Sequence, residues 1–367
     1  MPFTALLISV KKAIEVEYWV INSDGGLTTP EELTDVSEYT EKEFVKPLFE
    51  LKTPPCETMA DLRATFIDQL DEILARADEL DKLLVPLGTP INCEEIERLS
   101  SERGRIQKRV IGTEFDYASY CAGTHIHFEQ QNVVDQLNTL IALDPALALL
   151  NSSPYFQGTD VANSARAYLY RKKCYEDYPK HGQLWDYVET VGEWETRLQH
   201  RFEEFKAAAI EAGVDGDDVD ANFSPNTVVW TPVRLRKEMP TVEWRSPDAS
   251  LPSQILRLTR EANAVMEQIP NSVVRIDGDE AEIGQDTITI PTFDVVCDYA
   301  EEAIHEGIES ETVSGYLQQL GFDVQEYDTI TREIAGREIV SPREARDLRV
   351  KYATRLKEDV KSLREAA

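Results

Sequence analysis

The sequence predicts an α+β fold, in which strands and helices are mixed along one chain. Residues 13–20, 124–128 and 241–244 alternate between polar and apolar side chains, as half-buried strands do. Residues 57–84 instead repeat apolar side chains at helical spacing. The two kinds of segment follow one another without a regular strand–helix rhythm, which favours an α+β fold over a doubly wound one.

The elements of the first half are predicted from these patterns and from turn residues. Strand 13–20 is followed by a turn at Gly25-Gly26, and a second strand over residues 44–53 is ended by Pro54-Pro55. The elements expected next are the amphipathic helix 57–84, a short strand 85–90, the strand 124–128 and a buried helix 137–150.

The second half is predicted to be mainly helical. Its expected elements are a largely helical segment 179–212, strands 228–233 and 241–244, a helix 253–269 and a hairpin 275–290 around Gly278. The C-terminal tail is expected to be helical. Ser341-Pro342 resembles the start of its helix, because Pro is favoured at the first helical position.

The charge of the chain argues against a nucleic-acid partner and suggests a salt-rich medium. The 367 residues carry 68 acidic and 38 basic side chains, a formal charge of −30. Nucleic-acid binders that rely on phosphate contacts show the opposite balance, so we expect no nucleic-acid partner. A strongly acidic, lysine-poor surface suits a salt-rich cytosol, where screening weakens self-repulsion. We therefore expect a cytoplasmic protein of a halophile.

Cysteine usage and hydropathy agree with that compartment. The five cysteines form no CxxC pair and are widely spaced, which indicates free thiols rather than a disulfide framework or a zinc site. No apolar run approaches 18 residues, so no membrane span is expected. The N-terminus lacks the basic region and small-residue cleavage site of a signal peptide.

Three predicted strands each carry two ionisable residues at a spacing of two. The pairs are Glu15 and Glu17, His125 and His127, and Glu243 and Arg245. Side chains two apart on a strand share a face. Each of these strands therefore has an ionisable face and an apolar face.

The ordinary explanation of any single pair is a strand with its polar face toward solvent. Two adjacent carboxylates repel each other, however, and two histidines are a rare choice for a wet face. A shared divalent cation would explain both pairs. If the three strands met on one face, they would bring together carboxylates, imidazoles and a guanidinium. Such a set of groups can bind a polyphosphate with metal ions, so the residues alone suggest metal-dependent phosphoryl transfer.

At these residues the chain resembles the type 2 glutamate–cysteine ligase, or carboxylate–amine ligase, family of the glutamine-synthetase-like superfamily. The motifs that carry the resemblance are IEVEYWV (14–20), KPLFELKTPPCE (46–57), LVPLGTP (84–90), CAGTHIHFE (121–129), LDPALALLNSSPYFQG (143–158), SARAYLYR (164–171) and TVEWRSPD (241–248). Their wording is most similar to that of haloarchaeal members. Residues 271–367 carry no matching motif.

The resemblance implies a fold and a division of the chain. The family's fold is a curved, largely antiparallel β-sheet that forms a funnel-shaped active site, with helices packed on its outer face. We expect residues 1–270 to form the carboxylate–amine ligase domain. Residues 271–367 are expected to form a C-terminal hairpin and helical extension packed on the same domain.

The resemblance also implies the roles of single residues. The expected metal ligands are Glu15, Glu17, Glu43, Glu50, His125 and Glu243. The nucleotide is expected to lie near His125 and Arg245, and the catalytic residues are expected to be Arg245, His127 and Arg166. Arg245 would contact the transferred phosphate, His127 would lie near phosphate, and Arg166 would hold a substrate carboxylate or phosphate. The implied cofactors are ATP and Mg²⁺, for which Mn²⁺ could substitute.

The function implied by the resemblance is ATP-dependent formation of γ-glutamylcysteine from glutamate and cysteine through an acyl phosphate. The substrates are small molecules, no membrane partner is expected, and a homodimer is left open. Three alternatives are also open at this point. They are the same ligation with another carboxylate and amine, an inactive nucleotide-binding scaffold of the same fold, and a metal-dependent hydrolase that needs no ATP.

Overall fold

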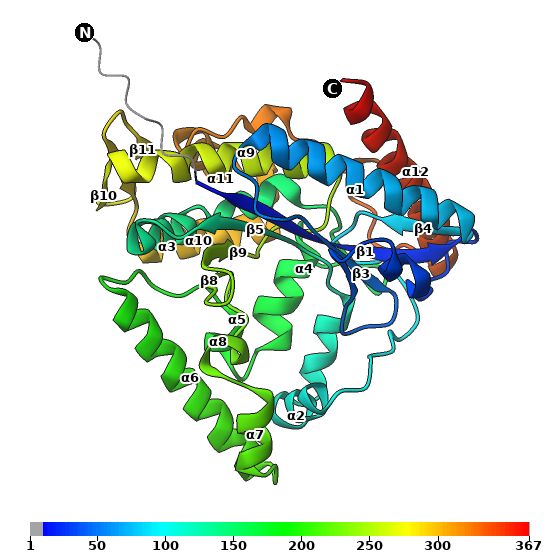
Figure 1. Cartoon of the computed structure of the whole chain (residues 1–367), viewed down its shortest axis with the longest axis horizontal. Coiled ribbons are helices and arrows are strands. Elements are labelled where there is room, and N and C mark those ends of the chain that lie inside the picture. The colour runs from blue at the N-terminus through cyan, green and yellow to red at the C-terminus, as the bar shows by residue number, and fades with distance from the viewer. Residues whose placement is uncertain (1–9, 367) are drawn as a thin grey trace.

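A seven-stranded antiparallel sheet forms the centre of the molecule (Figure 1). The computed structural model describes residues 10–366; residues 1–9 and 367 of the expected domain ranges, and most of the N-terminal run considered as a signal peptide, lie outside them. The strand order is β2-β3-β1-β5-β9-β8, and β4 pairs with β1. These strands are β1 (Lys12–Asn22), β2 (Thr40–Lys42), β3 (Leu48–Lys52), β4 (Lys82–Val85), β5 (Thr124–Glu129), β8 (Val233–Leu235) and β9 (Thr241–Trp244). The α+β class and the antiparallel sheet are confirmed.

The alternation of β1 separates two faces of the sheet. Ile14, Val16 and Tyr18 are buried in the main apolar core. Helices α1 (Met59–Glu79) and α9 (Pro252–Gln268) cover that side of the sheet (Figure 1). The opposite face carries the ionisable side chains, because successive residues of a strand point to opposite sides.

Helix α1 forms where it was predicted but ends earlier. Thr58 caps its N-terminus by accepting a hydrogen bond from the Asp61 backbone N–H. The predictions of helix up to residue 84 and of a strand at 85–90 are wrong. Asp81 has a φ of 53°, which stops the helix, and β4 then pairs with the second half of β1.

Two further predicted elements are wrong in their bounds. The predicted helix 137–150 is broken into α3 (Val133–Ala142) and a 3₁₀ helix (Asp144–Leu150), because Pro145 has no N–H to continue the hydrogen-bonding pattern. The predicted strand 228–233 is mostly irregular backbone between a short helix and β8. Pro225 starts α8 (Pro225–Val228), and β8 begins only at Val233.

Several further elements were not predicted. They are α2 (Glu102–Ile111), a 3₁₀ helix (Thr113–Tyr120), β6 (Tyr155–Phe156), β7 (Thr159–Asp160), α4 (Ala165–Tyr168), a π-helix (Leu169–Cys174) and α7 (Gly216–Asn222). The predicted helical segment 179–212 contains α5 (Pro179–Gly182) and α6 (Val191–Glu211), with irregular backbone between them.

The predicted hairpin 275–290 is also wrong. β10 (Val273–Ile276) pairs in parallel with β12 (Thr287–Ile290), and β11 (Glu282–Ile283) pairs antiparallel with β12. Gly278, with a φ of 57°, starts the connection rather than closing a hairpin.

The C-terminal helices pack against the first part of the chain. They are α10 (Phe293–His305), α11 (Glu311–Gln319) and α12 (Pro342–Glu365), the last capped by Ser341 as predicted. The Tyr316 hydroxyl donates to the Ala142 carbonyl at 2.7 Å, and the buried Arg349 side chain donates to the Pro90 carbonyl at 2.8 Å.

Within residues 10–366, no single helix has the length and hydropathy to cross a membrane. The bent pair formed by α3 and the 3₁₀ helix Asp144–Leu150 passes that test only when the two are taken together.

Candidate active site

The three strands with ionisable pairs are neighbours, and their registers align the pairs. Glu15 of β1 lies opposite His125 of β5, and His127 lies opposite Glu243 of β9. On the other side of β1, Glu17 lies opposite Glu50 of β3. Directly opposed residues of an antiparallel pair have their side chains on the same face. The sheet therefore gathers these residues into one continuous polar row.

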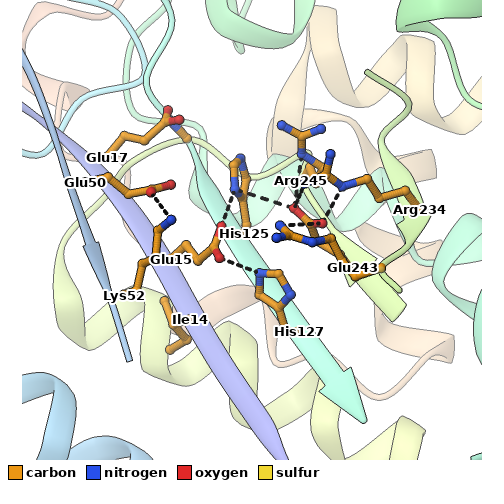
Figure 2. Close-up of polar contacts among 12 residues, drawn as sticks. Ile14, Glu15, Glu17, Glu50, Lys52, His125, His127, Arg234, Glu243 and Arg245 are labelled. Atoms are coloured by element: carbon orange, nitrogen blue, oxygen red, sulfur yellow. Dashed lines mark hydrogen bonds and ion pairs between the residues drawn. The ribbon is translucent and has the colours of Figure 1, made fainter. Parts of the chain in front are cut away.

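Glu15 occupies the middle of this row (Figure 2). One of its oxygens, Oε2, lies 3.2 Å from Nδ1 of His125, and the other, Oε1, lies 3.5 Å from Nε2 of His127. His127 is also anchored from behind, since its Nδ1 lies 3.1 Å from the Thr241 hydroxyl. Both imidazoles and the carboxylate are buried.

Three guanidinium groups surround the fully buried Glu243. Arg245 Nε lies 3.3 Å from its Oε1, and Arg236 Nη1 lies 3.6 Å from its Oε2. Arg234 contacts both oxygens, with Nη2 at 3.2 Å from Oε1. Arg234 and Arg236 were not among the predicted site residues. Arg234 lies on β8 and Arg236 directly follows it, so their spacing of two is the same signal as in the other pairs, but the strand was predicted at residues 228–233.

The far end of the row is rich in carboxylates. Glu17 Oε2 accepts a hydrogen bond of 2.6 Å from the Gly123 backbone N–H. Lys52 Nζ lies 2.8 Å from Glu50 Oε2 and also contacts Glu41 of β2. Lys52 and Glu41 were not predicted as site residues.

The pKa values of the carboxylates shift in opposite directions at the two ends of the row. For Glu15, burial raises the pKa, but hydrogen bonds from His125 and His127 outweigh it and hold the pKa well below its usual range. For Glu243, burial acts in the same upward direction and is outweighed by the charges of Arg234 and Arg245, so its pKa is also lowered. Both carboxylates are ionised at neutral pH.

At the carboxylate-rich end of the row the pKa values are raised instead. Burial and the nearby charge of Glu17 raise the pKa of Glu43 to about 8. Burial, followed by the charge of Glu43, raises the pKa of Glu50 well above its usual range. Carboxylates that repel one another in this way are typical of groups that share a cation.

The donor set fits divalent metal ions at three overlapping positions. Ligand atoms lie within 4.8 Å of one another in three groups, namely Glu15, Glu50 and His125; Glu15, His127 and Glu243; and Glu17, Glu43 and Glu50. Carboxylate oxygens with a single imidazole suit hard cations such as Mg²⁺ and Mn²⁺. Burial lowers the pKa of His125, and the charge of Arg245 acts in the same direction, so the imidazole is neutral, the form that binds a metal.

The three groups contain all six residues expected as metal ligands. They also include His127, which was expected near phosphate instead.

A small cavity beside Glu17 and His125 adds aromatic side chains to the site. Trp230 stacks on Tyr170 with ring centroids 5.6 Å apart, and the Arg245 guanidinium lies 5.3 Å from the Trp230 ring. Arg166 borders the same cavity. Its Nη1 and Nη2 donate to the carbonyls of Ser246 and Arg245, at 2.9 and 3.1 Å.

A known protein family matches the part of the chain that contains the polar row. The family model described as Glutamate-cysteine ligase family 2 matches residues 14–278, which include every strand of the polar row. The chain belongs to this family. In this member, the family's match begins at the first strand of the row and ends just beyond β10.

Among curated relatives of this family member, "Putative glutamate--cysteine ligase 2" from Corynebacterium glutamicum is 28% identical over 154 residues. That alignment spans 40% of this chain and 41% of the relative, which is less than half of its length. The same figures hold for the protein of a second strain.

Two solved structures are similar over nearly the whole chain. A bifunctional glutathione synthetase from Pasteurella multocida has a TM-score of 0.60 at 16% identity, covering 97% of this chain and 53% of that one. A glutamate–cysteine ligase from Francisella tularensis in complex with AMP has a TM-score of 0.55 at 12% identity, covering 98% and 92%. At such identities the likeness shows that these chains share a fold.

Proposed function

We propose that this protein is an ATP-dependent ligase that joins the γ-carboxylate of glutamate to the amine of cysteine. Membership of the glutamate–cysteine ligase family 2 supports the reaction class. The observation that carries the proposal is the polar row, in which three overlapping cation positions lie beside the arginines around Glu243. Repelling carboxylates next to guanidinium groups suit a metal-bound triphosphate.

The residues of the row divide the work of binding. Glu15, Glu17, Glu43, Glu50, His125 and Glu243 would hold Mg²⁺ or Mn²⁺. Such ions, when bound, neutralise charge on the phosphate oxygens of ATP. The AMP complex of the Francisella neighbour supports an adenine nucleotide as the ligand here. In the proposed arrangement the nucleotide lies near His125 and Arg245.

The proposed chemistry has two steps. An oxygen of the glutamate γ-carboxylate attacks the γ-phosphorus, the bond to the β,γ-bridging oxygen breaks, and ADP leaves. The cysteine nitrogen then attacks the acyl carbon, the carbon–oxygen bond to phosphate breaks, and inorganic phosphate leaves as the amine gives up a proton. Arg245, with Arg234 and Arg236 beside it, offsets charge on the transferred phosphoryl group, a role that requires positioning rather than covalent chemistry.

His127, on the neighbouring strand β5, contributes to the same site. It is fully buried, its Nδ1 lies near the Thr241 hydroxyl, and its Nε2 faces Glu15. We propose that Nε2 of His127 keeps the Glu15 carboxylate oriented toward phosphate. The Thr241 contact fixes the ring, because the group bound at one nitrogen sets the role of the other.

The wider setting is part of the proposal. Residues 10–270 carry every residue of the polar row, which supports a catalytic unit in that part of the chain and an extension in residues 271–366. The charge of −30 supports a salt-rich cytosol as the working medium.

ADP release tests the proposed function. Purified protein in high-KCl buffer receives Mg²⁺ and ATP, with glutamate and cysteine supplied separately and together. We expect ADP release only with both amino acids, and γ-glutamylcysteine by mass spectrometry. ADP release with another carboxylate–amine pair would keep the ligase and discard these substrates. Turnover without nucleotide, or tight Mg–ATP binding with no turnover for any pair, would contradict the proposal.

A further inference from the structure

The segment Ala165–Cys174 forms hydrogen bonds with the chain where it leaves β9. This segment consists of α4 followed directly by the π-helix Leu169–Cys174. The chain leaving β9 carries Arg245 and Ser246. Two arginines of the segment, Arg166 and Arg171, contact this exit from two directions.

Arg166 holds the main chain of the exit. Its two terminal nitrogens donate to the carbonyls of Arg245 and Ser246, and only 6% of the residue is exposed. Its guanidinium lies against Gly123, where a Cβ would collide with it. Gly123 in turn donates to Glu17, so this arginine packs between the ends of β5 and β9.

Arg171 holds the side chain of the exit through a buried ion pair. Its Nη1 and Nη2 donate to the two oxygens of Asp144 at 2.7 and 3.1 Å, and Nη2 also donates to the Ser246 hydroxyl at 2.8 Å. The Ser246 hydroxyl donates to Asp144, as does Nε1 of Trp244 at 3.2 Å. Asp144 is fully buried. The residues on both sides of Arg245 are therefore fixed by the same carboxylate.

The two arginines reach the same residue from adjoining helical segments. Residues five apart in an α-helix lie about 140° around the axis from each other. Arg166 lies in α4, and Arg171 lies in the π-helix that follows it, a type of turn that is frequent at functional sites. Arg166 and Arg171 are five apart, and both contact Ser246.

We propose that Arg166 and Arg171 are positioning residues, which hold the β9 exit so that Arg245 points at the transferred phosphoryl group. The inference rests on the proposed function, because Arg245 needs a phosphate to act on. The competing explanation is a buried ion pair that only stabilises the fold. A purely structural pair would change the fraction of folded protein but not the turnover of each folded molecule.

The test replaces Arg171 by Lys, which keeps the charge but not the two-pronged contact with Asp144. We expect Arg171→Lys to lower kcat by about 10- to 100-fold, since small misplacements of a charge-stabilising group are costly. The KM for ATP and for glutamate should stay within about twofold. Ser246→Ala, which leaves the ion pair in place, should lower kcat in the same way. Lys172→Gln on the same π-helix breaks only a partly exposed contact to Glu301 and should change nothing.

A double-mutant cycle with Arg245→Lys decides whether Arg171 acts through Arg245. With radiolabelled ATP to detect slow turnover, adding Arg171→Lys to that variant should lower kcat by less than about twofold. Full multiplication of the two losses would overturn the inference. So would a raised KM for glutamate at unchanged kcat, which would indicate direct substrate contact. A wild-type protein that turns over no substrate pair would instead contradict the proposed function.

Discussion

Glu15 shows how much of this site depends on one charged group. It contacts both histidines of β5 and belongs to two of the three cation groups. Because its pKa is held low by these histidines, it remains an anion even though it is buried. A neutral isostere at this position keeps the shape of the side chain but loses the charge that the proposed cation needs.

Glu15→Gln is therefore expected to lower turnover by about 10²- to 10³-fold or more, the range seen when one electrostatic contact to a transition state is removed. Thermal unfolding should show that the variant is folded. Glu282→Gln, an exposed carboxylate of β11, serves as the matched control and should behave as wild type. Full activity of Glu15→Gln at limiting Mg²⁺ would remove the metal assignment.

Glu43 and Glu50 lead to a prediction about pH. Their folded-state pKa values are raised, for Glu43 to about 8, by burial and neighbouring carboxylates. A raised acid pKa means that the folded state keeps a proton that the unfolded state has released. Its contribution to the stability of the metal-free protein is fully present below the ordinary carboxyl pKa and is lost as the pH rises to about 8.

At the proposed site Mg²⁺ would bind the ionised carboxylates, and it should therefore relieve this loss. We expect the increase in Tm produced by Mg²⁺, relative to EDTA, to be larger at about pH 8.5 than at about pH 5.5. Differential scanning calorimetry at both pH values measures it. An increase that is equal at both values, or larger in acid, would show that these carboxylates do not share a cation.

At the scale of elements, the sheet needs its apolar side to be filled. Leu70 of α1 is fully buried in the main core. Leu70→Ala should lower the free energy of unfolding by about 3 kcal/mol, because it leaves a cavity under the sheet. Ile210→Ala on α6, where the side chain is half exposed, should change it by less than about 0.5 kcal/mol. Denaturant titration of both variants checks the difference, and equal effects would contradict the packing.

The elements also show what the sequence could predict. Strands β1, β5 and β9 were predicted because each alternates polar and apolar residues, and that alternation alone places Glu15, His125 and Glu243 on polar faces. The contacts of Arg234 and Arg236 with Glu243 were not foreseen, because their strand was predicted at residues 228–233 and its register with β9 is a tertiary property. Arg171, which pairs with Asp144, lies on a π-helix, and this element leaves no hydrophobic period to recognise. The parallel pairing of β10 with β12 likewise depends on packing beyond the local turn.

For the whole molecule, the charge of −30 on 367 residues is the dominant property. Like charges at this density repel across the surface, and salt shortens the range of that repulsion from about 10 Å at 0.1 M to about 3 Å at 1 M. The Tm should therefore rise as KCl is raised over this range. Sucrose, which adds no ions, provides the control. A Tm that is flat or falls with KCl, or one that sucrose raises equally, would remove screening as the explanation.

The central claim is that this sheet activates a carboxylate with ATP, and isotope transfer tests it most directly. Glutamate labelled with ¹⁸O in its γ-carboxylate is turned over with Mg–ATP and cysteine, and the inorganic phosphate is examined by mass spectrometry. If an acyl phosphate forms, one labelled oxygen passes into each phosphate released, and Glu15→Gln lowers the rate at which labelled phosphate appears. Phosphate that is released without label, while ADP and amide accumulate, would contradict the account.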